Sequence, residues 1–263
     1  MTKPAENLRI AMLQSDLVWH RPELNMAAFA KKLRALSGGA FDLIVLPEMF
    51  TSGFTMEPEN IAEPDSGPAH RWLAEMSTET GAAVCGSVAA TSDGKFYNRM
   101  LWAEEGRTRA VYDKRHLFRM AGEQEVYTAG TRSETVTLKG WKILPRICYD
   151  LRFPVWSRSS EAHLQLYTAN WPAVRVDAWD KLAAARSIEN LSYTAVVNRV
   201  GTDGKGIGYN GHSAVYDFKG NVLAGTPEGE EAVLTAELSM AELIRFREKF
   251  PAHLDADRFT VHT

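Results

Sequence analysis

The sequence predicts an α/β fold in a single domain, and three observations support this prediction. Short apolar runs of strand length alternate with segments of helical periodicity in the N-terminal part of the chain. Hairpin signals follow, and neither an internal repeat nor a low-complexity linker divides the sequence. The chain has 263 residues, of which 45% are hydrophobic, so it can bury a sizeable core. We therefore expect one domain that spans residues 1–263.

The N-terminal segments predict the order strand, helix, strand. Residues 8–14 (LRIAMLQ) and 41–48 (FDLIVLPE) have the composition of buried strands. Residues 21–36 between them have helical periodicity, and Pro22 suits the first turn of a helix because that turn needs no backbone N–H donor.

A second helix is predicted over residues 66–81. Ser66 is the expected N-cap and Pro68 suits the first turn, while Gly81 is expected to end the helix before a strand at residues 82–90. The pattern thus adds another helix and strand to the first unit.

The middle of the chain predicts hairpins. Residues 96–114 form two apolar runs around Gly106, which suits a tight turn. Residues 135–140 and 141–150 predict two further strands, and the second of them leads into Cys148.

The composition argues against several classes of function. The net charge of −3 and the isoelectric point near 6.2 give no basic field for nucleic acid. The first residues lack the apolar core of a signal peptide, and no stretch reaches the roughly 18 uninterrupted apolar residues of a membrane span. We therefore expect a cytoplasmic protein that binds neither nucleic acid nor membrane. The two cysteines, Cys85 and Cys148, are then expected to be free thiols.

Three chemically functional side chains lie where predicted strands end. Glu48 follows the apolar run LIVLP, Lys114 follows AVYD, and Cys148 follows KILPRI. Ligands commonly bind at the carboxyl ends of strands in parallel sheets. Taken alone, a Glu or Lys at such a position is most often a solvated charge, and a Cys in an apolar run is a small buried hydrophobe. The second description fits Cys85, whereas Cys148 has polar and charged neighbours.

The chemistry of a thiol favours a shared site. A thiol has a reference pKa near 8.5, so a nearby cation is needed for a thiolate at neutral pH and a base is needed to manage the proton. Lys114 and Glu48 supply both groups. A Cys–His dyad is a weaker alternative, because none of the seven histidines falls in a known cysteine-protease motif. No Cys or His pair has metal-ligand spacing, so no metal is expected.

Eight motifs in order resemble the carbon-nitrogen hydrolase family, also called the nitrilase superfamily. They cover nearly the whole chain and read LPEMFTSGF, YDKRHLF, GEQEVYTAG, ICYDLRFP, TANWP, ARSIEN, VVNRVG and GHSAVYDFKG. The resemblance implies a four-layer α-β-β-α sandwich, a homodimer or higher homo-oligomer related by two-fold symmetry, and catalysis without a cofactor.

The resemblance also implies a Glu-Lys-Cys triad at Glu48, Lys114 and Cys148. Cys148 would attack the substrate carbonyl, Glu48 would transfer protons, and Lys114 would stabilise the oxyanion together with the backbone N–H of Tyr149. The additional glutamate that many members place near the site corresponds best to Glu123, where it would position Lys114.

Several other motif residues have open roles. Glu125 is the alternative to Glu123 as the additional glutamate. Phe54, Asn170 and Trp171 are expected to form pocket walls. A final group of residues is expected to serve mainly as scaffold, namely Asp150, Arg152, Pro154, Arg186, Glu189 and Asn190. For Arg186, contact with the substrate is the alternative.

Among amidases, the segments YDKRHLFRMAGEQE and CYDLRFPVW look most like the bacterial branch close to ω-amidases. This similarity implies hydrolysis of the terminal amide of a small 2-oxo acid, such as 2-oxoglutaramate or 2-oxosuccinamate. Carbamoyl amides and deaminated peptides remain alternative substrates, and nitrile hydrolysis is a weaker one. An acyltransferase and a non-catalytic binding protein on the same fold are the competing classes of function.

Overall fold

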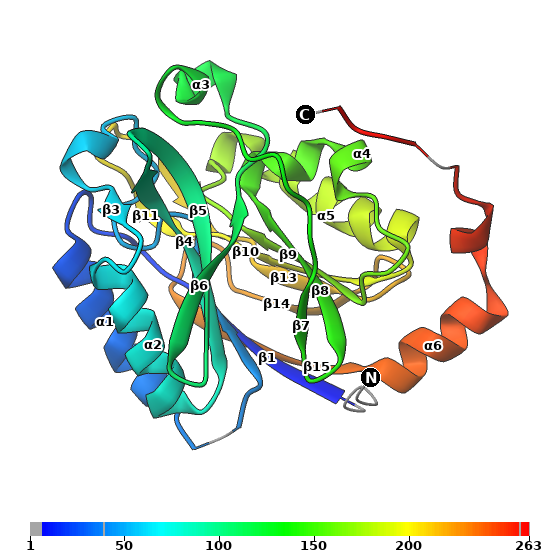
Figure 1. Cartoon of the computed structure of the whole chain (residues 1–263). Helices are drawn as coiled ribbons and strands as arrows, with labels where there is room; N and C mark the ends of the chain where they lie inside the picture. Colours follow the sequence, from blue (N-terminus) through cyan, green and yellow to red (C-terminus); the bar gives the residue numbers. More distant parts are fainter. Residues whose placement is uncertain (1–6, 39, 258, 263) are drawn as a thin grey trace.

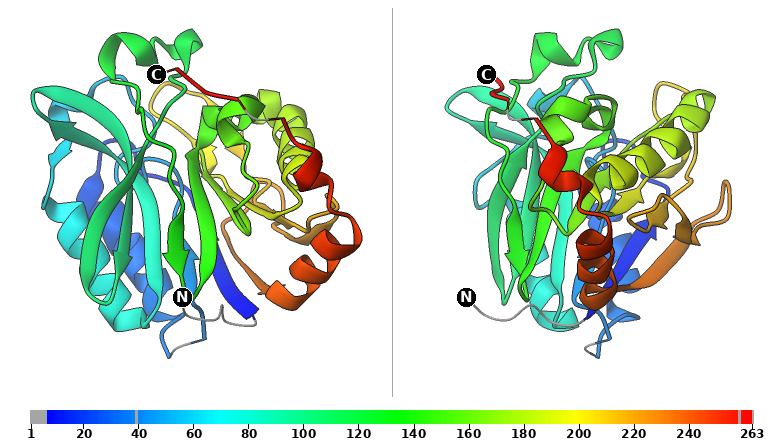
Figure 2. Two further views of the ribbon diagram at one scale, coloured as in Figure 1. Left: turned by 45° about the vertical axis from the view of Figure 1, so that its right-hand side comes forward. Right: turned by 90° about the vertical axis from the view of Figure 1, so that its right-hand side faces the viewer.

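The computed structural model, which describes residues 7–38, 40–257 and 259–262, consists of two β-sheets packed face to face between helices (Figure 1). Helices α1 (Pro22–Arg34) and α2 (Pro68–Thr80) cover the outer face of one sheet. Helix α5 (Val176–Asn190) covers the outer face of the other sheet (Figure 2). The predicted four-layer α-β-β-α sandwich is confirmed.

The first sheet contains β1 (Asn7–Gln14), β2 (Leu43–Val45), β3 (Glu63–Pro64), β4 (Ala83–Ser92), β5 (Lys95–Glu104), β6 (Arg107–Asp113) and β15 (Ala232–Ser239). The strand order is β15-β1-β2-β4-β5-β6, and β3 pairs with β4. Strand β2 runs parallel to β1 and β4, whereas β4, β5 and β6 form antiparallel hairpins. Strand β15 is antiparallel to β1 at the other edge, so this sheet has a parallel centre flanked by antiparallel strands.

The second sheet contains β7 (Val136–Leu138), β8 (Trp141–Ile147), β9 (Leu164–Thr168), β10 (Tyr193–Val197), β13 (Ala214–Tyr216) and β14 (Val222–Gly225). Its order is β14-β13-β10-β9-β8-β7, with a parallel centre formed by β8, β9 and β10. A separate two-stranded ribbon joins β11 (Val200–Thr202) to β12 (Gly208–Asn210).

The remaining helical elements are shorter than α1, α2 and α5. They are α3 (Glu123–Val126), α4 (Pro154–Ser157), α6 (Met240–Lys249), η1 (Pro58–Asn60), η2 (Arg119–Ala121), η3 (Cys148–Arg152), η4 (Ala173–Arg175) and η5 (Ala252–Asp255). The segment after α6 runs past α4 toward the end of the sandwich at which α3 lies (Figures 1 and 2). Among the described residues, no helix is both long enough and apolar enough to cross a membrane.

Strand β1 shows how the alternation of side chains builds the layers. Leu8, Ile10 and Met12 point between the two sheets and join a core with residues of β8, β9 and β10. Ala11 and Leu13 point to the opposite face and join the core beneath α1 and α2. Burial of a side chain such as Leu or Ile contributes about 1.5–3 kcal/mol, so both faces of the strand stabilise the fold.

Most predicted elements match the structure, and three details were wrong. The strand predicted over residues 141–150 ends at Ile147, where η3 begins. The strand predicted over residues 41–48 is limited to Leu43–Val45, and Pro47 beyond it lacks the N–H donor that a strand requires. Gly67, not Ser66, is the N-cap of α2. The backbone N–H of Ala69 in the first turn of the helix donates to the Glu63 carboxylate at 2.6 Å. Glu63 lies four residues before Gly67, outside the Ser-Gly-Pro pattern on which the predicted cap was based.

Three broader predictions are not tested by the structure of a single chain and stay predictions. These are the single domain over residues 1–263, the homo-oligomer and the cytoplasmic location.

Candidate active site

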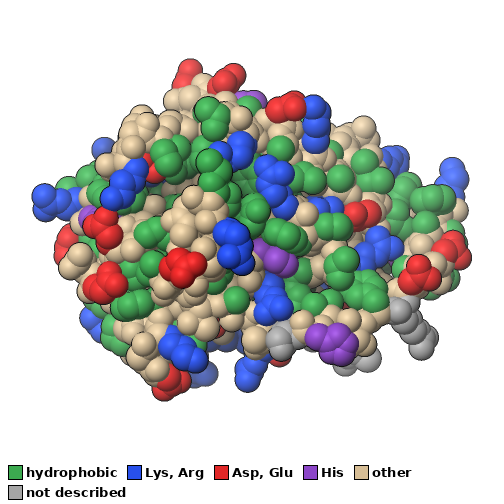
Figure 3. Space-filling model, turned by 90° about the horizontal axis from the view of Figure 1, so that it is seen from above, with side chains coloured by type: hydrophobic (Ala, Val, Ile, Leu, Met, Phe, Trp, Pro, Cys, Tyr) green, Lys and Arg blue, Asp and Glu red, His purple; other side chains and the backbone are tan. Residues whose placement is uncertain are grey.

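The predicted site residues converge at one end of the sandwich, although they come from both sheets. Glu48 follows β2 and Lys114 follows β6 in the first sheet, while Cys148 follows β8 in the second. Figure 3 looks onto this end of the molecule, where Lys and Arg side chains lie among hydrophobic ones. Strand β6 is antiparallel to β5, which is antiparallel to β4, so β6 runs in the same direction as β2 and its carboxyl end brings Lys114 to the same edge of the sheet as Glu48.

Cys148 occupies a strained position between β8 and η3. Its φ of 45° lies in the left-handed region, which costs a residue other than glycine about 1–3 kcal/mol. The side chain is buried, with the Sγ atom 3.9 Å from the backbone oxygen of Asn170. The following residue, Tyr149, lies in the first turn of η3, where helix geometry leaves backbone N–H groups without an intrahelical acceptor. The turn thus presents a thiol and a backbone donor together.

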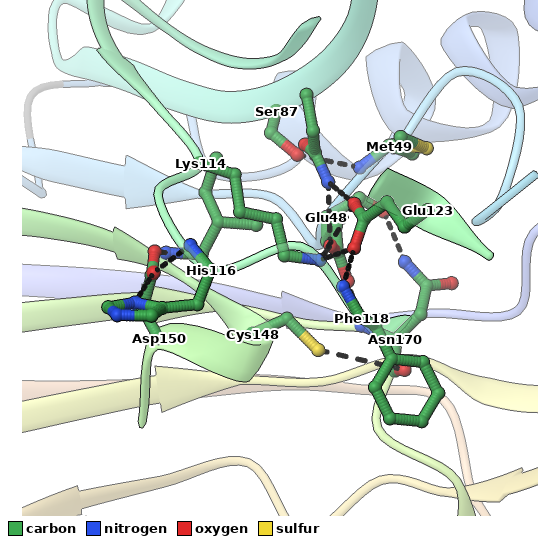
Figure 4. A network of polar contacts seen from close by, with 12 residues as sticks. Glu48, Met49, Ser87, Lys114, His116, Phe118, Glu123, Cys148, Asp150 and Asn170 are labelled. Carbon is green, nitrogen blue, oxygen red and sulfur yellow. Dashed lines mark hydrogen bonds and ion pairs between the residues drawn. The ribbon is translucent and has the colours of Figure 1, made fainter. Parts of the chain in front are cut away.

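Lys114 lies between two carboxylates, and all three side chains are fully buried (Figure 4). Its Nζ atom is 2.9 Å from Oε1 of Glu48 and 2.9 and 3.0 Å from the two carboxylate oxygens of Glu123. Glu123 also accepts from the backbone N–H of Phe118. Glu125 is exposed and contacts Gln124 instead. The structure therefore places Glu123, not Glu125, against Lys114.

Asn98 on β5 is a site residue that the sequence reasoning missed. Its fully buried side-chain amide donates to Glu48 Oε1 at 2.8 Å and lies 3.5 Å from Glu123 Oε1. Its backbone oxygen accepts from Lys114 N at 2.9 Å. A lone amide in the apolar run of β5 is a signal that could have identified it, because a buried amide requires partners.

Asn170 ties Glu48 to the second sheet. Its backbone N–H donates to Glu48 Oε2 at 2.8 Å, and its side-chain amide donates to the backbone oxygen of Glu48 at 2.6 Å. Both oxygens of the Glu48 carboxylate therefore accept hydrogen bonds from fixed donors. This carboxylate is oriented before any substrate binds.

The electrostatics of the site keep the proton on the thiol. Burial raises the pKa of Cys148 well above its ordinary value, the charge of Glu48 raises it further, and Lys114 opposes both effects. Burial also raises the pKa of Glu123, with Glu48 adding to the rise and Lys114 opposing it. Burial lowers the pKa of Lys114, but Glu123 and Glu48 outweigh it and hold the pKa above its ordinary value. The expected thiolate support by Lys114 is thus outweighed, and the resting Cys148 is a neutral thiol next to a base.

A cavity of about 200 Å³ opens above these groups. The predicted wall residues Phe54, Asn170 and Trp171 line it, and the Phe54 ring lies 4.9 Å from Lys114 Nζ. Ligand pockets commonly measure about 300–1,000 Å³, so this one suits a small substrate. Wall residues that the sequence reasoning did not identify include Trp19, Phe118, Arg175, Lys205, Ile207 and Tyr209.

The remaining motif residues divide between scaffold and pocket. Arg186 donates to the backbone oxygen of Leu151 at 2.6 and 3.0 Å and pairs with Glu189 at 2.8 Å, which agrees with a scaffold role. Asn190 donates to Arg186 O within the same helix. Arg152, which was expected to be scaffold, lines the cavity with its guanidinium 5.0 Å from the centre of the Trp171 ring. The direction in which the Arg152 side chain points could not be inferred from the motif alone.

Comparison with known proteins identifies the family. A model of the carbon-nitrogen hydrolase family matches residues 9–248. The chain belongs to this family. The hydrolase is 46% identical over 255 residues to the omega-amidase YafV of Escherichia coli (strain K12), with 96% of this chain and 98% of that protein covered. It is 34% identical over 254 residues to the 2-oxoglutaramate amidase of Bacillus subtilis (strain 168), with 94% and 96% covered.

A solved structure gives the same result for the fold. The hydrolase resembles the crystal structure of XC1258 from Xanthomonas campestris, a CN-hydrolase superfamily protein with an arsenic adduct in the active site. The TM-score is 0.94 and the sequence identity is 42%, with 98% of this chain and 100% of that chain covered. The resemblance inferred from the eight motifs is therefore confirmed.

Proposed function

We propose that the hydrolase is an ω-amidase that converts a small linear 2-oxo acid amide, of the 2-oxoglutaramate or 2-oxosuccinamate type, to a carboxylate and ammonia. The observation that carries the proposal is the buried Glu48–Lys114–Glu123 cluster beside Cys148 at the base of a small cavity. The similarity to proteins named omega-amidase and 2-oxoglutaramate amidase supports the substrate class.

The first half of the reaction forms an acyl-enzyme. Glu48 accepts the proton of the Cys148 thiol as the sulfur attacks the amide carbon, so a carbon–sulfur bond forms and the carbonyl oxygen becomes an oxyanion. Lys114 and the N–H of Tyr149 stabilise the oxyanion, at about 3–4 kcal/mol per donor. Glu48 then gives the proton to the nitrogen, the carbon–nitrogen bond breaks and ammonia leaves.

The second half regenerates the enzyme. Glu48 accepts a proton from water as the water oxygen attacks the thioester carbon. The carbon–sulfur bond breaks, the product carboxylic acid leaves, and Glu48 returns its proton to the sulfur. Glu123 acts on Lys114, because its carboxylate holds the ammonium against Glu48. Each proton that this scheme requires is carried by a residue of the chain.

The structure argues against two of the competing functions and leaves two others to be separated by experiment. A non-catalytic protein would have no need for a strained, buried thiol beside a fixed carboxylate, because such features lower stability. A deaminated peptide is larger than the cavity favours. Carbamoyl compounds and nitriles fit by size, so only turnover separates them from ω-amides.

The test is ammonia release from 2-oxoglutaramate, 2-oxosuccinamate, a carbamoyl amino acid and an aliphatic nitrile under one set of conditions. We expect the two 2-oxo acid amides to have the highest kcat/KM values. Higher turnover of the carbamoyl compound or the nitrile would contradict the assigned substrate class. Transfer of the acyl group to an added amine in preference to water would instead identify an acyltransferase.

A further inference from the structure

Two arginines in the cavity wall carry positive charge that the hydrolytic machinery does not use. Arg152 lies over the ring of Trp171, and Arg175 lies over the ring of Phe118 with its guanidinium carbon 5.3 Å from the ring centre. Within residues 7–38, 40–257 and 259–262, neither guanidinium forms an ion pair with a carboxylate. Both groups are therefore available to an anion from solution.

The other charged groups of the cavity are already engaged. Lys114 is held by Glu48 and Glu123, and Lys205 pairs with Glu57 at 2.8 Å. Asp203 accepts hydrogen bonds from two backbone N–H groups, those of Lys205 and Ile207, and from the Tyr209 hydroxyl, each at 2.9 Å. An anionic substrate thus meets no free acid in the described wall, and the unengaged charges that it meets are guanidinium groups.

The position of Arg175 fits the far end of a short substrate. Its backbone is fixed because Trp171 Nε1 donates to Arg175 O at 2.8 Å, just before α5 begins. The Phe118 ring beneath its guanidinium contacts the ring of Tyr149 edge to face at 5.0 Å. The Phe118 ring therefore lies between the Arg175 guanidinium and the ring of Tyr149, the residue whose backbone N–H is assigned to the oxyanion. In an extended four- or five-carbon chain, the amide and carboxylate carbons lie only about 4–5 Å apart.

We infer that Arg175 is a specificity-determining residue that binds the far carboxylate of the substrate and selects anionic ω-amides over neutral ones. This inference rests on the proposed function. A guanidinium binds a carboxylate through two parallel hydrogen bonds, and Arg175 is half-buried, so the pair is stronger than one in bulk water. Stacking on Phe118 restricts the side chain before the substrate arrives, which reduces the entropy lost on binding.

The test compares two substrates that differ only in the charged group. One is 2-oxoglutaramate, and the other is 4-oxopentanamide, in which a methyl group replaces the carboxylate. In Arg175→Met, we expect the kcat/KM ratio of the two substrates to fall by about ten- to a hundredfold, since a charged hydrogen-bonded contact is lost. The kcat/KM value for 4-oxopentanamide should stay within about threefold of the parent, because the reacting end is unchanged.

Two further variants make the result specific. Arg175→Lys keeps the charge but loses the paired geometry, so its ratio should lie between those of the parent and Arg175→Met. Arg119→Met removes an exposed arginine of η2 that lies outside the cavity wall, and it should keep the parent ratio. An equal fall of the ratio in Arg119→Met would show general electrostatic steering and overturn the inference.

Failure of the inference differs from failure of the proposed function. If the parent prefers 2-oxoglutaramate and Arg175→Met keeps that preference, Arg175 is not the anchor, and a loss confined to Arg152→Met would assign the role to Arg152. If the parent hydrolyses both amides equally well, the carboxylate-ended substrate class itself is wrong. A fall of the same size for both substrates in Arg175→Met would indicate a structural effect and would also overturn the inference.

Discussion

The Asp150 carboxylate accepts two hydrogen bonds from His116, one from the backbone N–H at 3.0 Å and one from ring Nδ1 at 2.8 Å. It also accepts from Ile147 N at 3.1 Å and from the Tyr112 hydroxyl at 2.6 Å. His116 follows Lys114 by two residues, and Ile147 immediately precedes Cys148. One buried carboxylate therefore fixes the lysine loop relative to the cysteine turn.

Asp150→Asn should destabilise the fold by about 2–4 kcal/mol, because one of the two accepting oxygens is replaced by an NH₂ donor that faces other donors. Urea denaturation at neutral pH measures the loss. The exposed Asp177, which pairs with Lys181 on α5, provides a control, and Asp177→Asn should change stability by less than about 0.5 kcal/mol.

The same contact predicts a pH dependence. Burial raises the pKa of Asp150, but hydrogen bonds from His116 and Tyr112 and the charge of Arg146 outweigh it and hold the pKa below its ordinary value. A depressed folded-state pKa adds stability above the unfolded-state pKa, near 4, and this stability is lost as the pH falls through the folded-state value. The stability gap between the parent and Asp150→Asn should therefore narrow below about pH 4. A gap that widens toward acid would contradict this assignment.

Asn98→Leu should leave the fold intact and lower kcat/KM by about ten- to a hundredfold, since Glu48 loses one of its fixed donors. Steady-state kinetics and a thermal melt separate the two effects. Asn98→Asp provides a second measurement, because it adds a third carboxylate beside Glu48 and Glu123. Its activity relative to the parent should rise as the pH is lowered and the new acid becomes a donor. The same relative activity at every pH would exclude this positioning role.

Cys148→Ala should abolish ammonia release while the melting profile stays close to that of the parent. Cys85→Ala should reduce activity only slightly, because Cys85 is fully buried between the sheets and burial raises its pKa. Mass spectrometry after treatment with an alkylating amide should locate the modification at Cys148 alone in the native protein. Turnover by Cys148→Ala within tenfold of the parent would disprove the nucleophile assignment.

Glu48→Gln and Lys114→Met should shift the titration of Cys148 in opposite directions. The charge of Glu48 raises the pKa of this thiol and the charge of Lys114 lowers it. Loss of Glu48 should therefore move thiolate formation to lower pH, and loss of Lys114 should move it to higher pH. The ultraviolet absorbance of the thiolate, recorded in a Cys85→Ala background, measures both shifts. Both variants should be nearly inactive, and shifts of the same sign would refute the charge arrangement.

The sequence allowed prediction of those features that depend on local pattern or ordered motifs. The strand predicted at residues 8–14, Gly81 at the end of α2 and the hairpin around residues 105–106 all match the structure. Lys114 and Glu123 lie in motifs that could be matched to the motifs of the family. Asn98, Arg152 and Arg175 could not be assigned because their roles depend on where side chains from distant elements point. The protonated state of Cys148 depends on burial among three elements, which no single motif encodes.

Asn170, which follows β9 of the second sheet, donates two hydrogen bonds to Glu48, which follows β2 of the first. The chemistry thus exists only after the two sheets have packed across their shared core. Recovery of enzymatic activity during refolding should consequently report the packing of the two sheets, whereas far-ultraviolet circular dichroism reports the content of strands and helices. A lag of activity behind the dichroism signal would measure how long each sheet exists without its counterpart.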